Sequence, residues 1–309
     1  MISVCIPVYN SEVSGLVDSL IRQGLAAGIP FEIIAIDDYS DTGFRKCNQK
    51  ELAGFRYIAL ERNIGRAKIR NLFLEYAKYD KLLFLDCDSV IISEEFLQKY
   101  INKINQDFST VICGGTVYEA EAPPLKKRLR WKYGINREVS PPSLRNKHPY
   151  RHFRSNNFLI DREVFKKLKF DERIAGYGHE DTLFAYDLQK NNISLLHTDN
   201  PVKHHVHESN REFLAKTRNS ISNLIQITGY AGKDDDFIRN IRILRVYKKI
   251  KDYSLRGITG FVFVVCGPVI EFVLVRGGAW LWLYDFYKLG HLIRKDKICN
   301  AGKQSRKLS

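Results

Sequence analysis

The feature that most constrains this chain is the alternation of apolar runs with helical patterns over its first hundred residues. Four short apolar runs are typical of β-strands and cover residues 2–8, 32–37, 55–59 and 81–85. Three segments have helical spacing and cover residues 14–27, 64–78 and 94–104. Strands separated by such helices indicate parallel βαβ units, so we expect an α/β domain with a Rossmann-like sheet.

Polar side chains follow three of these strands where each strand ends. Residues 7–10 close the first strand, Asp37 and Asp38 close the second, and Asp86 and Asp88 follow the fourth. Ligands of open α/β sheets bind beyond the carboxyl ends of the strands. Carboxylate pairs at two matched positions therefore indicate a binding site at this edge.

Each carboxylate pair has a functional and a structural interpretation. Asp86 and Asp88 can hold a hard divalent cation that also takes phosphate oxygens, or they can form a turn at Ser89. Asp37 and Asp38 can accept hydrogen bonds from a base or ribose, or they can form an Asx turn.

Two helix starts also carry candidate residues. Lys68 and Arg70 can bind phosphate near a helix N-terminus, or they can belong to a basic helix face capped by Asn63. Glu180 and Asp181 follow a glycine-containing turn, where one of them can act as general base or complement the helix dipole.

Three histidines lie close together after Pro201, and any of them could contribute a metal ligand. In a strand, His205 and His207 share a face while His204 points the opposite way. The three histidines therefore cannot all ligate one metal ion without distortion. Which of them is a metal ligand stays open at this point.

The formal net charge of +14 excludes an acidic solvating protein and indicates an anionic partner, which can be a nucleotide, a nucleic acid or a membrane surface. The basic residues concentrate in segments 124–154, 239–256 and 288–307. The six cysteines form no CxxC pair, which argues against a zinc ribbon or a disulfide scaffold. No signal-peptide pattern precedes the first strand, so we expect a cytoplasmic protein.

The C-terminal part has a different character. Segment 238–250 has the spacing of a basic amphipathic helix, and segment 257–270 is uncharged but interrupted by glycines and Pro268. That segment is shorter than the roughly 20 residues a spanning helix needs. The aromatic run that starts at Trp280 suits a membrane–water interface. We expect interfacial attachment; the alternative is a soluble helical appendage whose aromatic side chains pack on the main domain.

Taken together, these motifs resemble family 2 glycosyltransferases of the GT-A fold, from residue 2 to about residue 216. The resemblance is carried by residues 6–10, 36–40, 63–67 with 70–71, 84–88, 156–160 and 178–181. The glycine turn before Glu180 also resembles the galactosyltransferase-like branch. The N-terminal part, residues 1–235, is thus expected to be the GT-A domain, and residues 236–309 a helical, membrane-associating region.

The resemblance implies a nucleotide-sugar donor, most often a UDP-sugar, bound with Mn2+ or Mg2+. Asp38 or Asp37 would contact the base and ribose, Asp86 and Asp88 would bind the ribose and the metal–diphosphate, and His204 best matches the family's later histidine. Asp181, with Glu180 beside it, would be the base of an inverting reaction. The remaining donor-binding positions implied by the motifs are Pro7, Tyr9, Asn10, Asn63, Gly65, Lys68, Arg70 and Asn157.

The sequence departs from the processive members of that family, because the QxxRW motif is missing after Asp181. The resemblance therefore implies a single-addition enzyme that acts on a glycan or lipid-linked acceptor at the inner face of the cytoplasmic membrane. We expect segment 122–149 to be a long loop that folds over the donor, with Arg154 as a candidate diphosphate contact.

Two other classes explain fewer of the residues. A sugar nucleotidyltransferase needs a glycine-rich basic loop after the first strand, where this chain has Tyr9, Asn10, Ser11 and Glu12. A non-catalytic protein that binds membrane or nucleic acid accounts for the charge but not for the carboxylates at the strand ends. We expect no nucleic-acid partner.

Overall fold

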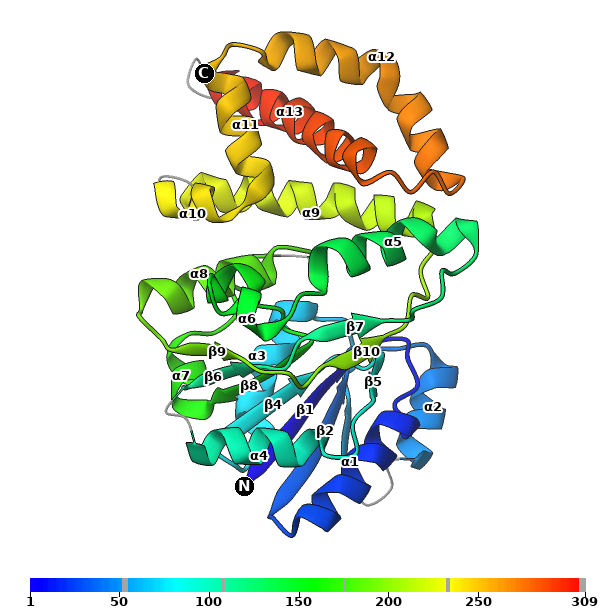
Figure 1. Ribbon diagram of the computed structural model, residues 1–309, viewed down its shortest axis with the longest axis vertical. Coiled ribbons are helices and arrows are strands. Elements are labelled where there is room, and N and C mark those ends of the chain that lie inside the picture. Colours follow the sequence, from blue (N-terminus) through cyan, green and yellow to red (C-terminus); the bar gives the residue numbers. More distant parts are fainter. Residues whose placement is uncertain (52–54, 107–108, 175, 232–233, 306–309) are drawn as a thin grey trace. The chain divides into compact units, whose positions relative to one another are not determined.

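The computed structural model describes residues 1–51, 55–106, 109–174, 176–231 and 234–305, and the chain forms two compact units (Figure 1). Unit 1 comprises residues 1–120, 137–175 and 180–205, and unit 2 comprises residues 121–136, 176–179 and 206–309. This packing division differs from the boundary at residue 235 expected from the sequence. The long helix that follows residue 209 packs with the C-terminal helices, so it belongs to unit 2.

In the described part of the chain, unit 1 is built on a seven-stranded sheet in the order β3-β2-β1-β4-β8-β6-β9. The strands are β1 Ile2–Val8, β2 Phe31–Asp37, β3 Arg56–Ala59, β4 Lys81–Leu85, β6 Val111–Cys113, β8 Asn157–Asp161 and β9 Leu195–His197. β1 runs parallel to β2 and β4, whereas β8 runs antiparallel to its neighbours β4 and β6. The expected α/β class is confirmed.

Helices cover both faces of this sheet. They are α1 Ser14–Ala27, α2 Thr42–Glu51, α3 Arg66–Tyr76, α4 Phe96–Gln106, α6 Pro142–Arg145, α7 Arg162–Lys167, α8 Glu180–Lys190 and the 3-10 turn η3 Pro149–His152. Alternate β1 side chains face opposite ways, so that Val4 and Ile6 pack with α1 and α4, while Cys5 packs on the side of α3, α7 and α8. Burial on both faces explains why the strands read as nearly continuous apolar runs.

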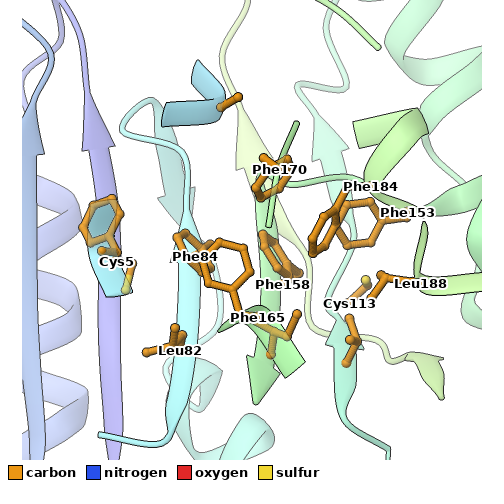
Figure 2. Packing of buried hydrophobic residues seen from close by; sticks show 14 of the residues in the cluster. Cys5, Leu82, Phe84, Cys113, Phe153, Phe158, Phe165, Phe170, Phe184 and Leu188 are labelled. Atoms are coloured by element: carbon orange, nitrogen blue, oxygen red, sulfur yellow. The ribbon is translucent and has the colours of Figure 1, made fainter. Parts of the chain in front are cut away.

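Phenylalanine rings fill the second of these two cores (Figure 2). Phe84 of β4 stacks on Phe158 of β8 at 4.9 Å, and Phe170 stacks on Phe184 of α8 at 4.3 Å. These contacts join the fourth strand, the antiparallel strand and α8, which fixes the start of α8 against the sheet. The cluster is therefore the scaffold for the residues at the first turn of α8.

A second sheet in unit 1 has three strands among the described residues, in the order β5-β10-β7. They are β5 Ser89–Ile91, β7 Thr116–Tyr118 and β10 Val202–His204. In this sheet His204 pairs with Ser89 on the antiparallel neighbour and with Tyr118 on the parallel one. The register thus places the end of β10 beside the segment that follows β4.

The expected long loop over residues 122–149 is wrong. The segment contains η1 Leu125–Lys127, α5 Arg128–Tyr133, the π-helical turn η2 Gly134–Glu138 and α6, and it leads into η3. Pro142 and Pro149 stand in the first positions of short helices, where proline is favoured because its missing N–H needs no partner. The prolines that favoured a loop in this segment instead stand at the starts of short helices.

Unit 2 consists mainly of helices, namely η1, α5, α9 Asn210–Tyr230, α10 Asp235–Asn240, α11 Arg242–Asp252, α12 Arg256–Val275 and α13 Leu281–Ser305. Its core contains Phe213, Phe263, Leu274, Tyr284 and Tyr287. Much of the aromatic run expected at an interface is therefore packed inside unit 2.

The uncharged segment 257–270 lies within a helix that is longer than the segment itself. α12 continues through Pro268 and Glu271 to Val275, because Glu271 pairs with Arg218 of α9 at 2.9 Å instead of ending the helix. By length and composition alone, α12 is the one helix among the described residues that could cross a membrane.

Candidate active site

The carboxyl ends of the parallel strands of unit 1 meet at one edge, and the start of β8 lies at the same edge. Val8 at the end of β1 pairs with Asp37 at the end of β2, and Leu85 at the end of β4 lies opposite Asn157 of β8. Asp86 donates its backbone N–H to the carbonyl of Asn156 at 3.1 Å. The segments expected to carry the site are therefore neighbours in space.

The two carboxylates after β2 are occupied by internal hydrogen bonds. Asp38 is buried and accepts the backbone N–H groups of Ile64 at 2.6 Å and Gly65 at 3.0 Å. Burial raises the pKa of Asp38 above its usual value, although these two hydrogen bonds act in the opposite direction. Asp38 thus holds the loop that enters α3, where Gly65 adopts a φ of 88°.

Asp37 is fully buried, and its two oxygens accept Ser40 N–H at 2.7 Å and the Tyr57 hydroxyl at 2.9 Å. Asp37 thus forms a local turn with Ser40, whereas Asp38 fastens a loop that is distant in sequence. Asn63 contributes to the same arrangement by donating its amide to the Asp38 carbonyl at 3.0 Å.

Exposed aromatic side chains stand on the loops after β1 and β2. Tyr9 is 55% exposed and Tyr39 is 51% exposed. Asn10 joins the two loops, because its N–H donates to Ser40 Oγ at 2.8 Å and its Oδ1 accepts Asp41 N–H at 2.7 Å. Both Asn10 and Tyr39 have positive φ angles, 47° and 68°. Pro7 lies inside β1, one residue before the strand ends.

Two arginines of the first turns of α3 connect the β4 and α8 carboxylates. Arg70 is 1% exposed and donates to Asp86 Oδ1 at 2.8 Å. Arg66 donates to Glu180 Oε1 at 2.7 Å, and its guanidinium lies 3.7 Å from Asp86 Oδ2. The expected phosphate contact of Arg70 is not supported by this burial; the side chain orients Asp86 instead.

Asp88 pairs with one of the three histidines. Its Oδ2 lies 3.3 Å from His204 Nδ1. Burial would raise the pKa of Asp88, but the hydrogen bond and the charge of His204 outweigh it and lower the pKa. His205 points to Glu119 instead, with Nδ1 3.3 Å from Oε1, and His207 is exposed beyond the end of β10. The register of β10 with β5 thus selects His204 as the neighbour of Asp88.

The two carboxylates at the start of α8 have opposite environments. Glu180 is buried, which would raise its pKa, but the charges of Arg66 and Arg70 hold that pKa below its ordinary value. Burial raises the pKa of Asp181, and the negative charge of Glu180 raises it further. Asp181 Oδ2 accepts the Ser155 N–H at 3.2 Å, whereas its buried Oδ1 has no hydrogen-bond partner in the described part of the chain.

The glycine turn that precedes these carboxylates has the backbone conformation that glycine favours. Gly176 and Gly178 have φ angles of 78° and 100°, and His179 also has a positive φ of 70°. The turn belongs to unit 2, where the carbonyls of Tyr177 and Gly178 both accept the amide of Asn223 on α9 at 3.2 Å. A side chain at position 178 would meet Ser220 Cβ at 2.5 Å.

Asn157 and Lys68, both expected to contact the donor, differ in burial. Asn157 is 1% exposed, accepts the Tyr100 hydroxyl at 2.7 Å and donates to the carbonyls of Gly115 and Asn200. This amide holds three segments together and does not face a ligand, so the expected donor contact of Asn157 is not supported. Lys68 is exposed in the first turn of α3.

The described residues supply some, but not all, of the ligands that a divalent cation needs. Asp88, immediately before β5, and His204, at the end of β10, supply a carboxylate and an imidazole, a donor set that Mn2+ accepts. Among the described residues, no group of three or more His, Cys, Asp or Glu side chains is arranged to hold a metal ion. A cation here would therefore need further oxygen ligands from a bound molecule, as Mg2+ and Mn2+ take from phosphates.

Sequence reasoning missed the role of three residues that the structure places at this edge. Arg66 was recognised only as part of a motif, yet it contacts both Glu180 and Asp86. Tyr39 and Ser155 were likewise given no role. A signal for Arg66 was available, since an arginine at the first position of a helix is disfavoured by the helix dipole unless acidic groups face it.

Comparison with known proteins identifies the family to which these features belong. Residues 3–169 match the family model described as Glycosyl transferase family 2. A poly(ribitol-phosphate) beta-glucosyltransferase of Bacillus spizizenii is 37% identical over 117 residues, which are 36% of this chain and 18% of that protein. A chondroitin synthase of Pasteurella multocida is 26% identical over 226 residues, 60% of this chain and 23% of that protein. The matched parts thus span about a fifth of these relatives.

Solved structures share the fold. The mannosyltransferase PcManGT from Pyrobaculum calidifontis, in complex with GDP-Man and Mn2+, superposes with a TM-score of 0.59 at 14% identity, covering 97% of this chain and 86% of that one. S. aureus TarS 1-349 in complex with UDP gives a TM-score of 0.51 at 18% identity, covering 96% and 91%. At such low identity, these likenesses establish the fold alone.

Proposed function

This chain belongs to glycosyl transferase family 2, whose model matches more than half of it, and on that premise we propose that it transfers a sugar from a nucleotide-sugar to a hydroxyl group. Its fold, a central mixed sheet with a helical C-terminal region, is the expected GT-A fold. The donor is a UDP-sugar, the reaction inverts the anomeric centre, and a divalent cation is needed.

One observation carries the proposal. Carboxylates and basic groups from four separate segments converge at the carboxyl edge of the sheet: Asp86 and Asp88 after β4, Arg66 on α3, His204 on β10 and the pair at the start of α8. Three ion pairs, Arg66–Asp86, Arg66–Glu180 and His204–Asp88, join these four segments. A single ion pair can be explained by its contribution to stability. The convergence of several ion pairs at one edge instead supports a site for a charged ligand.

The two α8 carboxylates divide their roles according to their surroundings. The guanidinium of Arg66 pairs with Glu180 and stabilises its negative charge. Glu180 in turn positions that guanidinium. Asp181 has a raised pKa and a buried oxygen without a partner, which suits a general base. In the transfer, Asp181 takes the proton of the acceptor hydroxyl, the hydroxyl oxygen bonds to the anomeric carbon, and the bond from that carbon to the diphosphate oxygen breaks.

Asp88 and His204 would hold the cation, with Asp86 oriented beside them by Arg70. Bound there, Mn2+ or Mg2+ supplies a positive charge that neutralises the diphosphate leaving group. Relatives in fold have been crystallised with Mn2+ or Mg2+ and a nucleotide, which supports this choice.

Residues of the first loops would hold the nucleotide. Tyr9 and Tyr39 offer exposed rings for a base, on loops that Asn10 fastens together. Lys68 lies at the N-terminal turn of α3, which favours an anion. UDP is favoured as the nucleotide because TarS, which shares the fold, binds it. Asp37 and Asp38 would act indirectly, through the loops that they hold.

The acceptor proposed is a glycan or a lipid-linked glycan, and the place of work is the inner face of the cytoplasmic membrane. The absence of a QxxRW motif after Asp181 favours addition of one sugar over polymerisation. The Bacillus spizizenii relative acts on poly(ribitol phosphate) by its name, so a polyol-phosphate polymer belongs among the acceptors to be assayed.

Calorimetric titration with UDP tests the donor site. We expect UDP binding in the presence of Mn2+, loss of that binding in EDTA, and loss in an Asp88→Ala variant, because Asp88 would no longer ligate the cation. Asp18→Ala, which removes an exposed carboxylate on α1, is the matched control and should bind UDP as the wild type does. Binding that survives both EDTA and Asp88→Ala would refute the metal-dependent site.

A further inference from the structure

One face of α12 is apolar and exposed along its whole length. Large apolar side chains that are 40% to 70% exposed recur there at helical spacing, and we call them the α12 stripe: Ile258, Phe261, Val262, Val265, Val269 and Phe272. Val264 beside them is also exposed. Monomeric soluble proteins seldom expose so continuous an apolar surface unless it binds something.

The opposite face of α12 is fastened to unit 2 from end to end. Phe263 packs against Phe286, Tyr287 and His291 of α13, and it approaches Gly290 so closely that an added Cβ there would lie 2.0 Å from its ring. Farther along, Glu271 pairs with Arg218 of α9. Figure 1 shows α12 and α13 as the orange and red helices of this unit.

Aromatic and basic side chains flank the stripe. Arg276 lies 4.1 Å over the ring of Phe272 at the C-terminal end of α12. Trp280 and Trp282 are 54% and 68% exposed and stack on each other at 6.5 Å. Tryptophan beside arginine is the composition found where a protein meets the polar boundary of a bilayer.

The helix immediately before α12 adds positive charge. α11 buries Leu244 and Tyr247 and exposes Arg245, Lys249 and Lys251. Arg242 and Lys248 are also exposed, but they pair with Asp285 and Asp235. A basic face next to an exposed apolar helix provides electrostatic attraction to anionic lipid headgroups.

We infer that the α12 stripe docks on a bilayer that contains anionic lipids, with α12 lying in the plane of the interface and not across it. The inference rests on the membrane location proposed above and identifies the surface responsible. A lipid surface is favoured over a second copy of the chain because every copy carries a formal net charge of +14, so two copies repel each other, whereas anionic headgroups neutralise basic side chains such as Arg276 beside the stripe.

The packing of α12 argues against a span. A spanning α12 would take its partner α13 with it, and α13 carries Asp285, Lys288, Arg294 and Asp296. Charged side chains in the hydrocarbon core are costly. An in-plane helix instead needs one apolar face toward the lipid and one face toward the protein, which is the distribution that α12 has.

Vesicle flotation of the 309-residue chain tests the inference. Vesicles of phosphatidylcholine with phosphatidylglycerol are compared with vesicles of phosphatidylcholine alone, for the wild type and for Phe261→Ser/Phe272→Ser. We expect wild-type binding that needs the anionic lipid and weakens in high salt, and a loss of at least about tenfold in the double variant. Leu25→Ser/Leu144→Ser, which changes two exposed leucines of unit 1, is the matched control and should bind as the wild type does.

Three outcomes would overturn the inference. Vesicle binding of the double variant equal to that of the wild type would place the lipid contact elsewhere on the chain. A bound fraction that cannot be transferred to an excess of fresh vesicles indicates a span. A wild type that ignores vesicles but dimerises in light scattering, with the dimer lost in the double variant, makes the stripe a contact between copies.

Titration of UDP into the same proteins separates this inference from the proposed function. All contacts assigned to the donor lie in unit 1, so the double variant should bind UDP with the affinity of the wild type, which also shows that it is folded. Normal UDP binding without vesicle binding would refute only the membrane inference. Vesicle binding without UDP binding would refute only the donor site.

Discussion

At the scale of single residues, neighbouring carboxylates are given different chemistry by what surrounds them. Glu180 and Asp181 are adjacent in the chain, yet Arg66 stabilises the charge of Glu180 while burial disfavours the charge of Asp181. Environments that push two pKa values apart mark separate acid–base roles. Arg66 is therefore a positioning residue whose effect on transfer passes through Glu180 and Asp86.

Replacement of Asp181, the proposed general base, gives a direct prediction. Asp181→Asn should lower kcat by about 10²- to 10⁴-fold, because the acceptor hydroxyl loses its proton acceptor. UDP affinity should be unchanged. Since the pKa of Asp181 is raised and the base must be ionised, kcat/KM of the wild type should rise with pH through a value above the usual range of an aspartate.

Steady-state kinetics against pH and UDP titration check both statements. Asp187→Asn changes the same residue type on the same helix, away from the assigned contacts, and should keep wild-type kinetics. Full activity in Asp181→Asn combined with inactivity in Glu180→Gln would transfer the role of base to Glu180.

At the scale of elements, a buried arginine and a buried histidine fasten α6 and η3 to the end of β9. Arg145 donates to His197 Nδ1 at 3.1 Å and to the carbonyl of Thr198 at 2.8 Å, and His197 Nε2 lies 2.9 Å from the carbonyl of Pro149. Because a guanidinium only donates, Nδ1 must accept, and the proton of the neutral ring lies on Nε2. Burial lowers the pKa of His197 to about 4.

This histidine makes stability depend on pH. Below its ordinary pKa of 6.5, the unfolded chain takes up a proton that the folded chain refuses until the pH approaches 4, so lowering the pH over that window favours unfolding. Over that window, the proton uptake by the unfolded chain lowers the free energy of unfolding by about 3 kcal/mol. Denaturant unfolding of the wild type and of His197→Gln at several pH values measures it.

The wild type should have a higher free energy of unfolding than His197→Gln at pH 6.5, and this difference should shrink as the pH falls to 4. His148→Gln, at an exposed position close by, should show no such change. A constant difference between wild type and His197→Gln across the window would contradict the assigned tautomer and its cause.

At the scale of the whole molecule, the chemistry and the proposed lipid contact belong to different units. Every residue assigned to donor, cation or base lies in unit 1, and the α12 stripe lies in unit 2. The packing of unit 2 is held by Arg218, which donates to Glu271 Oε1 at 2.9 Å and to the Tyr287 hydroxyl at 2.6 Å. Damage to unit 2 should therefore leave donor binding intact.

Arg218→Ala should cost about 1–3 kcal/mol of unfolding free energy, because Glu271 and Tyr287 lose a charged donor. Its affinity for UDP should equal that of the wild type. Arg22→Ala removes an exposed ion pair of 4.0 Å on α1 and is the control, with an expected change below about 0.5 kcal/mol. A large loss of UDP affinity in Arg218→Ala would show that unit 2 contributes to the donor site.

Local pattern was sufficient to identify the class of fold and to predict the sheet edge at which the candidate site lies. Alternating apolar runs and helical spacing are properties of short segments, and they located β1, β4 and α1 with the bounds that the structure has. The ends of parallel strands meet at one edge by geometry, so Asp37 and Asp86 could be placed near each other before any contact was known. Family membership followed from motifs at those ends.

The partner of each side chain was decided only by tertiary structure. The family resemblance favoured His204 but left His205 and His207 as alternatives, and only the register of β10 with β5 brings His204 to Asp88. Arg70 and Asn157 were expected to face the ligand, yet packing buries both and commits their polar groups to protein atoms. α12 extends to Val275 because Glu271 finds Arg218 on another helix. A sequence determines periodicity within a segment, whereas burial and pairing depend on contacts between segments that no local pattern encodes.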